Sequence, residues 1–306
     1  MVHAEHDEWT RWGPVAPGVF VARLPELDLN VVAVAGADGF ALVDTGSYER
    51  ETRGLLAGLE RMLSEHGLPY RALAVVNTHG HFDHCYGNAE VLRQFPDAEV
   101  VGHAALAAYL AEWGEQGRAD AVRHGMPAED MAAVRIVPPT HPVPGAGEVY
   151  HLGGDRRLVL EPIPEGAHTA ADLAVYVPHC GLLLTGDLVE QSGPPSCGPD
   201  SFPFTWPDAI RRALDIALSP EDQDVGGDVG EVLRVVPGHG DLVTARFAAD
   251  QQREIAGVVA ELRRWHRRRV PAAEAVARGE WPWDEAAVGR FAARGYRLLD
   301  LAERRA

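Results

Sequence analysis

The segment Thr78-His79-Gly80-His81-Phe82-Asp83-His84, directly after the apolar run Leu73-Ala74-Val75-Val76, places three histidines and a carboxylate within six positions. Imidazole and carboxylate groups are ligands that zinc, iron and manganese accept. In an extended segment alternate residues point the same way, so His79 and His81 can converge on one ion. Asp83 and His84 then lie in the following turn, directed at a neighbouring position. The segment therefore predicts a metal site, with a cluster of surface histidines as the alternative.

Three more candidate ligands stand far along the chain, each at or just after the end of a predicted strand. They are His168, Asp187 and His239. The apolar stretches that precede Asp187 and His239 have the composition of buried strands. A metal centre needs ligands that converge from separate strands, and chance does not readily provide them. We therefore expect these residues to join the cluster at 79–84.

Apolar periodicity and glycine- or proline-containing turns divide the rest of the chain into strands and helices. The polar segment 114–133 is predicted to be helical in pieces, with a lid as one interpretation. The proline-rich segment 136–144 is interpreted as a crossing loop, and 190–206 as an irregular loop. We expect strands at 18–24, 29–34, 40–43, 71–77, 98–102, 149–152, 157–163, 173–177, 182–187 and 232–236, and helices at 49–66, 87–92, 104–113, 206–219 and 244–267, with two helical pieces in 270–306.

The composition argues against several classes of protein. The net charge of −17, from 28 basic and 45 acidic residues, disfavours a nucleic-acid binder, because such binding depends on clustered cations. The sequence contains no lysine, which excludes any mechanism that needs one. Its three cysteines do not form a disulfide pattern, and neither a signal peptide nor a membrane span is recognisable. We expect a cytoplasmic protein with a small-molecule substrate and with no nucleic-acid or membrane partner.

Five motifs in this order resemble the signature of the metallo-β-lactamase superfamily: Asp44, the cluster His79 to His84, His168, Asp187 and His239. The resemblance covers roughly residues 18–246. It implies an α/β fold of the four-layer αββα type, with the metal site at one edge between two sheets. We expect a tail at 1–17, the αββα domain at 18–246 and a C-terminal helical extension at 247–306 packed on it. Asp44 is either a turn residue at a strand end or a support for the metal site from behind.

The resemblance also implies a binuclear site. One divalent ion would be held by His79, His81 and His168, and a second by Asp83, His84 and His239, with Asp187 bridging both. Zinc is the metal that we expect first, with iron or manganese as alternatives. A hydroxide shared by the two ions would attack a carbonyl or phosphoryl centre. Asp187 and Asp83 are the candidate catalytic residues, since Asp83 could also accept a proton.

An aspartate at the bridging position, here Asp187, resembles the hydroxyacylglutathione hydrolase, lactonase and phosphodiesterase branches of the superfamily. True β-lactamases of the superfamily usually have another residue there. Because arginine is the only long basic side chain available and no glutathione-binding motif is recognisable, we expect a small ester, thioester or lactone as substrate. Phe202, Phe204 and Trp206 are candidate pocket walls. The alternatives are a phosphodiesterase, a non-catalytic metal-binding protein, and a persulfide dioxygenase-like enzyme with one iron on His79, His168 and Asp187.

Overall fold

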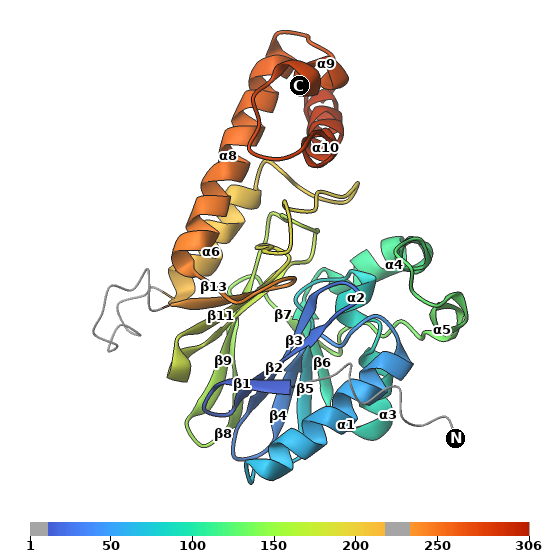
Figure 1. The fold of residues 1–306 in the computed structure, drawn as a ribbon, viewed down its shortest axis with the longest axis vertical. Coiled ribbons are helices and arrows are strands. Elements are labelled where there is room, and N and C mark those ends of the chain that lie inside the picture. Colours follow the sequence, from blue (N-terminus) through green and yellow to red (C-terminus); the bar gives the residue numbers. More distant parts are fainter. Residues whose placement is uncertain (1–11, 218–232, 306) are drawn as a thin grey trace.

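Two β-sheets face each other and helices cover their outer faces (Figure 1). The computed structural model describes residues 12–217 and 233–305. The predicted four-layer αββα sandwich with a C-terminal helical extension is confirmed. The whole acidic segment 221–231, which its composition predicts to be a loop, lies outside the described residues, and so does the end of the helix predicted at 206–219.

The first sheet has seven strands in the order β1-β2-β3-β4-β5-β6-β7. Strands β1 to β4 pair antiparallel, whereas β4 to β7 pair parallel. Parallel neighbours need a crossover connection, which helices provide here. The strands are β1 (Trp12–Ala16), β2 (Val19–Leu24), β3 (Leu29–Ala35), β4 (Phe40–Val43), β5 (Ala72–Val76), β6 (Glu99–His103) and β7 (His141–Val143).

The second sheet has six strands in the order β13-β12-β11-β10-β9-β8. Its only parallel pair among the described residues is β11 with β12, and its other neighbours are antiparallel. The strands are β8 (Glu148–Gly153), β9 (Arg156–Pro162), β10 (Leu173–Val177), β11 (Leu182–Gly186), β12 (Arg234–Pro237) and β13 (Val243–Thr244).

Strands β3, β4, β10 and β11 are buried along their whole length. One face of each packs against the opposite sheet and the other against helices, which explains their continuous apolar runs. Full burial of each valine or leucine contributes about 1.5–3 kcal/mol. The apolar layer between the sheets includes Val32, Val43, Val76, Val101, Leu160, Val175 and Leu184.

Helices cover both outer faces. On the first sheet, Leu55, Leu59 and Leu63 of α1 pack on Phe20, Leu42 and neighbouring strand residues. On the second sheet, α6 and α8 pack on β10, β11 and β12. No helix in the described ranges is long and apolar enough to cross a lipid bilayer. The helices are α1 (Glu49–Glu65), α2 (Phe82–Cys85), α3 (Asn88–Gln94), α4 (Leu106–Arg123), α5 (Ala128–Ala133), the 3₁₀ turn η1 (Pro178–Cys180), α6 (Trp206–Ala217), α8 (Ala245–Arg267), α9 (Ala272–Arg278) and α10 (Glu285–Glu303).

One edge of the sandwich collects the ends of four strands that carry polar residues. Asp44 follows β4 and the 79–84 cluster follows the parallel neighbour β5, while Asp187 follows β11 and His239 follows its parallel neighbour β12. Backbone hydrogen bonds from Leu173 N to Thr78 O (2.7 Å) and from Asn30 N to Gly238 O (2.8 Å) tie the two sheets together here. The fold therefore brings the predicted motifs to one place.

Three segments differ from the sequence prediction. Trp12–Ala16, expected as part of a tail, is the edge strand β1, because its alternating residues pair with β2. The segment 114–133 is helical in pieces, as predicted, but its first piece is continuous with the helix predicted at 104–113, so that α4 runs to Arg123 and α5 follows. The predicted crossing loop contains strand β7, which pairs parallel with β6. The division of the chain at residues 17 and 246 stays a prediction.

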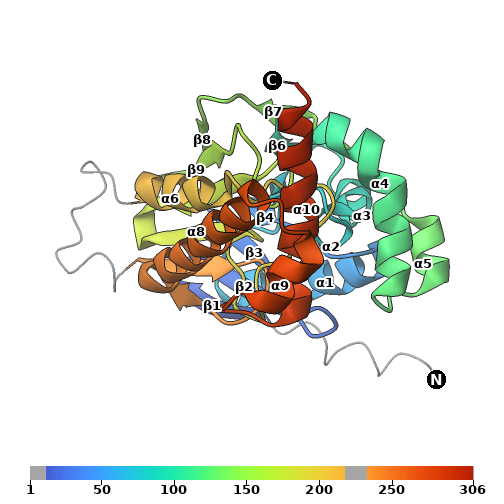
Figure 2. The same ribbon diagram turned by 90° about the horizontal axis from the view of Figure 1, so that it is seen from above.

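The C-terminal extension packs on the second sheet side of the sandwich. In Figure 1, α8, α9 and α10 stand at the end of the molecule opposite α1, and Figure 2 shows α10 lying across the top. Val288 and Phe291 of α10 are fully buried in the same apolar cluster as Ile255 of α8 and Trp206 of α6. The extension and the second sheet therefore share one core.

We expect Phe291→Ala to destabilise the chain by about 3–5 kcal/mol, because it leaves a cavity in that shared core. Chemical denaturation followed by circular dichroism measures this change. Leu301→Ala is the control, since Leu301 lies on the same helix with its side chain 40% exposed, and it should change stability by less than about 0.5 kcal/mol. A loss confined to a separate, minor transition would show that the extension folds independently.

Candidate metal centre

The cluster after β5 is almost entirely buried. His79 and His84 are 1% and 0% exposed, and Asp83 is buried as well. His81 has an extended backbone and occupies the N-cap position of the short helix α2, and its side chain joins that of His79 in one ligand group. Asp83 and His84 lie within α2 and face a different point. The single helical turn therefore separates the cluster into two halves, as the residue spacing predicted.

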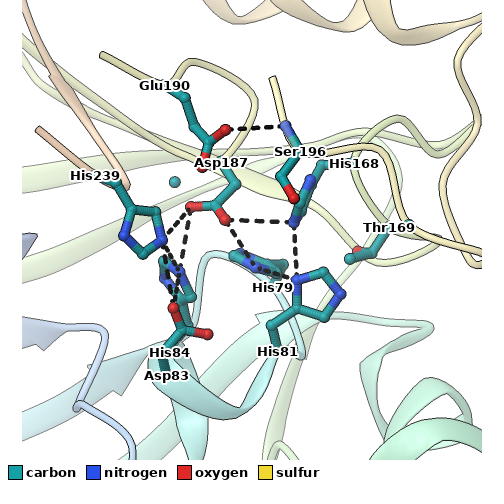
Figure 3. A network of polar contacts seen from close by, with 12 residues as sticks. His79, His81, Asp83, His84, His168, Thr169, Asp187, Glu190, Ser196 and His239 are labelled. Carbon is teal, nitrogen blue, oxygen red and sulfur yellow. Dashed lines mark hydrogen bonds and ion pairs between the residues drawn. The ribbon is translucent and has the colours of Figure 1, made fainter. Parts of the chain in front are cut away.

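The first half joins a distant histidine and a carboxylate. His79 Nε2 lies 3.1 Å from His81 Nδ1, and His168 Nε2 lies 2.8 Å from the same atom. Asp187 Oδ2 lies 3.8 Å from His79 Nε2 and 3.4 Å from His168 Nε2 (Figure 3). A tetrahedral zinc site with Zn–N bonds of about 2.0–2.1 Å places neighbouring ligand atoms roughly 3.3 Å apart. These four side chains have that spacing.

The second half is built in the same way on the other oxygen of Asp187. Asp187 Oδ1 lies 3.2 Å from His84 Nε2 and 3.4 Å from His239 Nε2. Asp83 Oδ2 lies 3.6 Å from His84 Nε2 and 3.3 Å from His239 Nε2. The structure thus brings together all seven predicted ligands, in two groups that meet at Asp187 (Figure 3).

The Asp187 carboxylate fits between the two groups because the neighbouring residue, Gly238, has no side chain. A Cβ atom at residue 238 would be 1.8 Å from Asp187 Oδ1, so any side chain there would displace the carboxylate. The Oδ1 atom is buried and makes no hydrogen bond with any described residue. A buried carboxylate oxygen without a donor is costly, and a bound cation would remove that cost.

In each ligand histidine, one ring nitrogen faces the cluster (the inner nitrogen) and the other faces away from it (the outer nitrogen). For three of these histidines, the hydrogen bond of the outer nitrogen shows that the inner nitrogen is free to bind a metal. His239 Nδ1 lies 2.7 Å from the carbonyl oxygen of Leu27, which only accepts, so this nitrogen donates. His84 Nδ1 lies 2.8 Å from Asp44 Oδ2, and His81 Nε2 lies 3.1 Å from a carboxylate oxygen of Asp200. In the neutral rings, His239 Nε2, His84 Nε2 and His81 Nδ1 therefore present lone pairs to the centre. This donor set fits a divalent cation.

The electrostatics agree with that fit. Burial alone would lower the pKa of His239, but Asp187 and Asp83 outweigh it and raise that pKa to about 12. Burial alone would raise the pKa of Asp83, yet His84 and His239 lower it to about 2. The two carboxylates thus favour positive charge at this point, which protons supply when no metal ion does.

Asp44 lies behind the cluster, as the resemblance implied. Its Oδ1 accepts a hydrogen bond from the Thr78 backbone N–H and its Oδ2 accepts one from the Thr78 hydroxyl, both at 2.8 Å. Oδ2 also lies next to His84. Asp44 has φ 63°, in the left-handed region, which turns its side chain back under β5. It therefore fixes both the start of the histidine segment and one ring within it.

Several residues of the site were not predicted from the sequence. Glu190 forms a third possible ligand group with Asp187 and His239, and its Oε2 accepts a hydrogen bond of 2.9 Å from Ser196 N. Burial, together with Asp187, raises the pKa of Glu190 to about 8. Asp172 binds the backbone N–H of Thr169 and so shapes the loop of His168. The sequence offers one signal for Glu190, its position three residues after Asp187, and none for Asp172.

A cavity of about 620 Å³ opens onto the cluster. The prediction that Phe202, Phe204 and Trp206 form its walls is wrong, because none of them lines this cavity: Trp206 is in the core, whereas Phe202 and Phe204 are half-buried against Gly166 and Gly295. Trp206 is fully buried behind His168, with ring centroids 5.3 Å apart. The cavity walls include Leu27, Phe82, Tyr109, Trp113, Arg123, Asp200 and Arg290.

The three cysteines take no part in the ligand groups of the described residues. All are free thiols, and Cys85 and Cys197 are buried. Burial raises the pKa of Cys85 well above its ordinary value, so this thiol stays protonated and unreactive.

Three curated relatives have similar sequences. The chain is 32% identical to the hydroxyacylglutathione hydrolase of Rhodobacter capsulatus over 155 residues, a stretch that covers 50% of this chain and 46% of that protein. It is 29% identical over 209 residues to the hydroxyacylglutathione hydrolase of Synechococcus sp. (strain WH7803), covering 66% and 65%. It is 27% identical over 245 residues to the acyl-coenzyme A thioesterase MBLAC2 of Gallus gallus, covering 76% and 81%. The chain spans less than two thirds of both hydroxyacylglutathione hydrolases.

Solved structures show the same fold at low sequence identity. A metallo-beta-lactamase from Pontibacter korlensis matches with a TM-score of 0.60 and 20% identity, over 81% of this chain and 99% of that chain. A double mutant of the sec-alkyl sulfatase PisA1 matches with a TM-score of 0.71 and 16% identity, over 96% of this chain and 51% of that chain.

The sequence model of the metallo-beta-lactamase superfamily matches residues 24–239, which is more than half of the chain and includes every predicted ligand. With the αββα fold and the ligand geometry described above, this match leads to one conclusion: the chain belongs to the metallo-beta-lactamase superfamily.

Proposed function

We propose that the chain is a binuclear metal-dependent hydrolase of a small ester, thioester or lactone. One observation carries the proposal: the two oxygens of the buried Asp187 carboxylate face two separate groups of ligand atoms. His79, His81 and His168 would hold one divalent ion, and Asp83, His84 and His239 the other. Zinc suits these imidazole and carboxylate ligands, and iron or manganese would also be accepted.

When bound, the two ions would acidify a shared water molecule and polarise the oxygen of the group under attack. The chain's own residues orient this chemistry. Asp187 keeps the two ligand groups in register, because one rigid carboxylate belongs to both. Asp83 lines the cavity and is ionised at neutral pH, so it can accept the proton that the attacking water releases. No serine or cysteine nucleophile is needed.

A thioester is the substrate class that we favour among the three. The three relatives are named as a hydrolase of hydroxyacylglutathione, in two cases, and as an acyl-coenzyme A thioesterase. The cavity has the size of a small-molecule site, with apolar walls at Phe82, Tyr109 and Trp113. The chain has no lysine, but Arg290 lines the cavity and offers a guanidinium group to a negatively charged substrate; Arg123 lines it too, in an ion pair with Asp120.

The test is metal quantification of the purified protein, followed by a panel of thioesters, lactones, carboxylic esters and phosphodiesters. We expect two ions per chain and turnover of a thioester. One iron per chain, with oxygen uptake on a persulfide, would instead support the dioxygenase alternative. A fully metallated protein that turns over nothing in the panel would support a non-catalytic metal-binding protein.

We expect His79→Ala and Asp187→Ala each to lower kcat/KM by at least about 100-fold, because each removes a ligand from the reaction centre. Circular dichroism should show that both variants keep the fold. His141→Ala and Asp208→Asn are matched controls, since neither residue belongs to the ligand groups: His141 pairs with Glu99 and Glu148 and contacts the Tyr150 ring, and Asp208 pairs with Arg211. A ligand variant with the wild-type rate would refute the assignment.

Metal uptake should release protons at pH 7. The raised pKa of His239, about 12, means that this side chain is protonated in the metal-free protein, and an incoming ion must displace that proton. Apparent zinc affinity should therefore increase as the pH rises. Calorimetric titration of metal-free protein in two buffers of different ionisation enthalpy measures the number released, and His239→Ala should release fewer. Equal heats in both buffers would contradict this expectation.

A further inference from the structure

The outer nitrogen of His81 has a partner that belongs to none of the five family motifs. Asp200, in the loop between β11 and α6, places its Oδ2 atom 3.1 Å from His81 Nε2. The Asp200 side chain is 6% exposed and the His81 side chain 27% exposed, so the carboxylate is the more deeply buried of the two partners. A carboxylate only accepts, which means that His81 Nε2 carries the hydrogen and that Nδ1 keeps its lone pair.

A second element holds the same carboxylate oxygen. The hydroxyl of Tyr109, in α4, donates a hydrogen bond of 2.6 Å to Asp200 Oδ2. The Tyr109 ring lies directly on the backbone between the two ligand histidines: a Cβ atom at Gly80 would be 2.3 Å from Tyr109 Cδ1. Glycine between His79 and His81 is therefore what allows the tyrosine to approach Asp200.

The other ligand histidines lack this arrangement. His84 also donates to a carboxylate, but Asp44 belongs to the family motifs and supports the second ligand group. His239 donates to a backbone carbonyl, and His168 Nδ1 has no hydrogen-bond partner among the described residues. Within the first ligand group, His81 is thus the ring that hydrogen bonds to a carboxylate, and that carboxylate is itself fixed from α4.

We propose that Tyr109 and Asp200 form a clamp that orients His81 and sets the affinity of the ion at the first ligand group, without controlling the second. This inference rests on the proposed function. A carboxylate on the outer nitrogen fixes the tautomer and ring orientation of a ligand histidine and makes its inner nitrogen a stronger donor. Tyr109 and Asp200 are positioning residues here, because they act through His81. Both also line the cavity, so the clamp is part of the wall that a substrate meets.

Two measurements on zinc-loaded protein test the clamp. Stepwise competition with a chelator gives the dissociation constants of the two ions. Nitrogen-15 NMR of labelled histidines reports the N–H groups that exchange slowly with water. The variants are Asp200→Ala, Asp200→Asn and Tyr109→Phe, and the matched control for loss of charge is Asp208→Asn on the surface of α6. Asp44→Asn is the comparison for the second ligand group.

We expect Asp200→Ala to raise the dissociation constant of one of the two ions by about 10–100-fold, because it removes the hydrogen-bond partner of the outer nitrogen of a ligand histidine. The slowly exchanging Nε2–H signal of His81 should disappear, while the Nδ1–H signal of His84 remains. Tyr109→Phe keeps the ring on Gly80 and should shift the His81 signal with a smaller loss of affinity for the same ion. Asp44→Asn should affect the His84 signal instead.

The clamp is refuted if Asp200→Ala leaves both dissociation constants and the His81 signal as they are in Asp208→Asn. It is equally refuted if Asp200→Ala raises the dissociation constants of both ions to the same extent. Should Asp200→Ala fail to fold, Asp200→Asn and Tyr109→Phe decide by the same criteria. If the wild-type chain binds two ions and hydrolyses its substrate while the clamp variants behave like Asp208→Asn, the clamp is refuted and the proposed function stands. A wild-type chain that binds no ion refutes both.

Discussion

The burial of the Asp187 carboxylate among four imidazoles is the constraint on which the rest of the site depends. Each of its oxygens lies within 3.8 Å of two ring nitrogens, and the side chain is only 6% exposed. An isolated carboxylate in such a position would cost several kcal/mol. Without a metal ion, protons on the surrounding rings offset part of this cost, because Asp187 and the neighbouring carboxylates raise the pKa values of His84 and His239. The arrangement is stable with positive charge at the centre, which is what divalent ions provide.

The two sheets make this burial possible. The parallel pairs β4–β5 and β11–β12 end at the same edge, so residues that follow them converge without a long loop. Hydrogen bonds from Leu173 to Thr78 and from Asn30 to Gly238 hold the strand ends of one sheet against the other. Glycine at position 238 then leaves room for the carboxylate. The site is rigid because it lies on strand ends that the core already fixes.

The parts of this site that the sequence could predict are those with local signals. The histidine cluster has a spacing that reports its geometry, and His168, Asp187 and His239 follow recognisable apolar strands. Tyr109 and Asp200 could not be predicted, because α4 and the 190–206 loop meet at His81 only in the folded chain. Phe202, Phe204 and Trp206 were placed in the cavity wall on composition alone. Aromatic residues in an irregular loop turn inward as readily as outward, and here Trp206 packs into the core against Phe291 of α10, while Phe204 is half-buried against the same cluster.

That inward packing gives the C-terminal extension a physical connection to the metal centre. His168 Nδ1 has no hydrogen-bond partner among the described residues, so on this side the ring is held by packing, while its Nε2 faces His81. The contact is Trp206, whose ring in turn stacks on Phe291 of α10 with centroids 5.7 Å apart. Arg290, next to Phe291, reaches the cavity. One turn of α10 therefore supports a candidate ligand from behind and contributes to the cavity wall in front, which makes the extension part of the site rather than an addition to a finished domain.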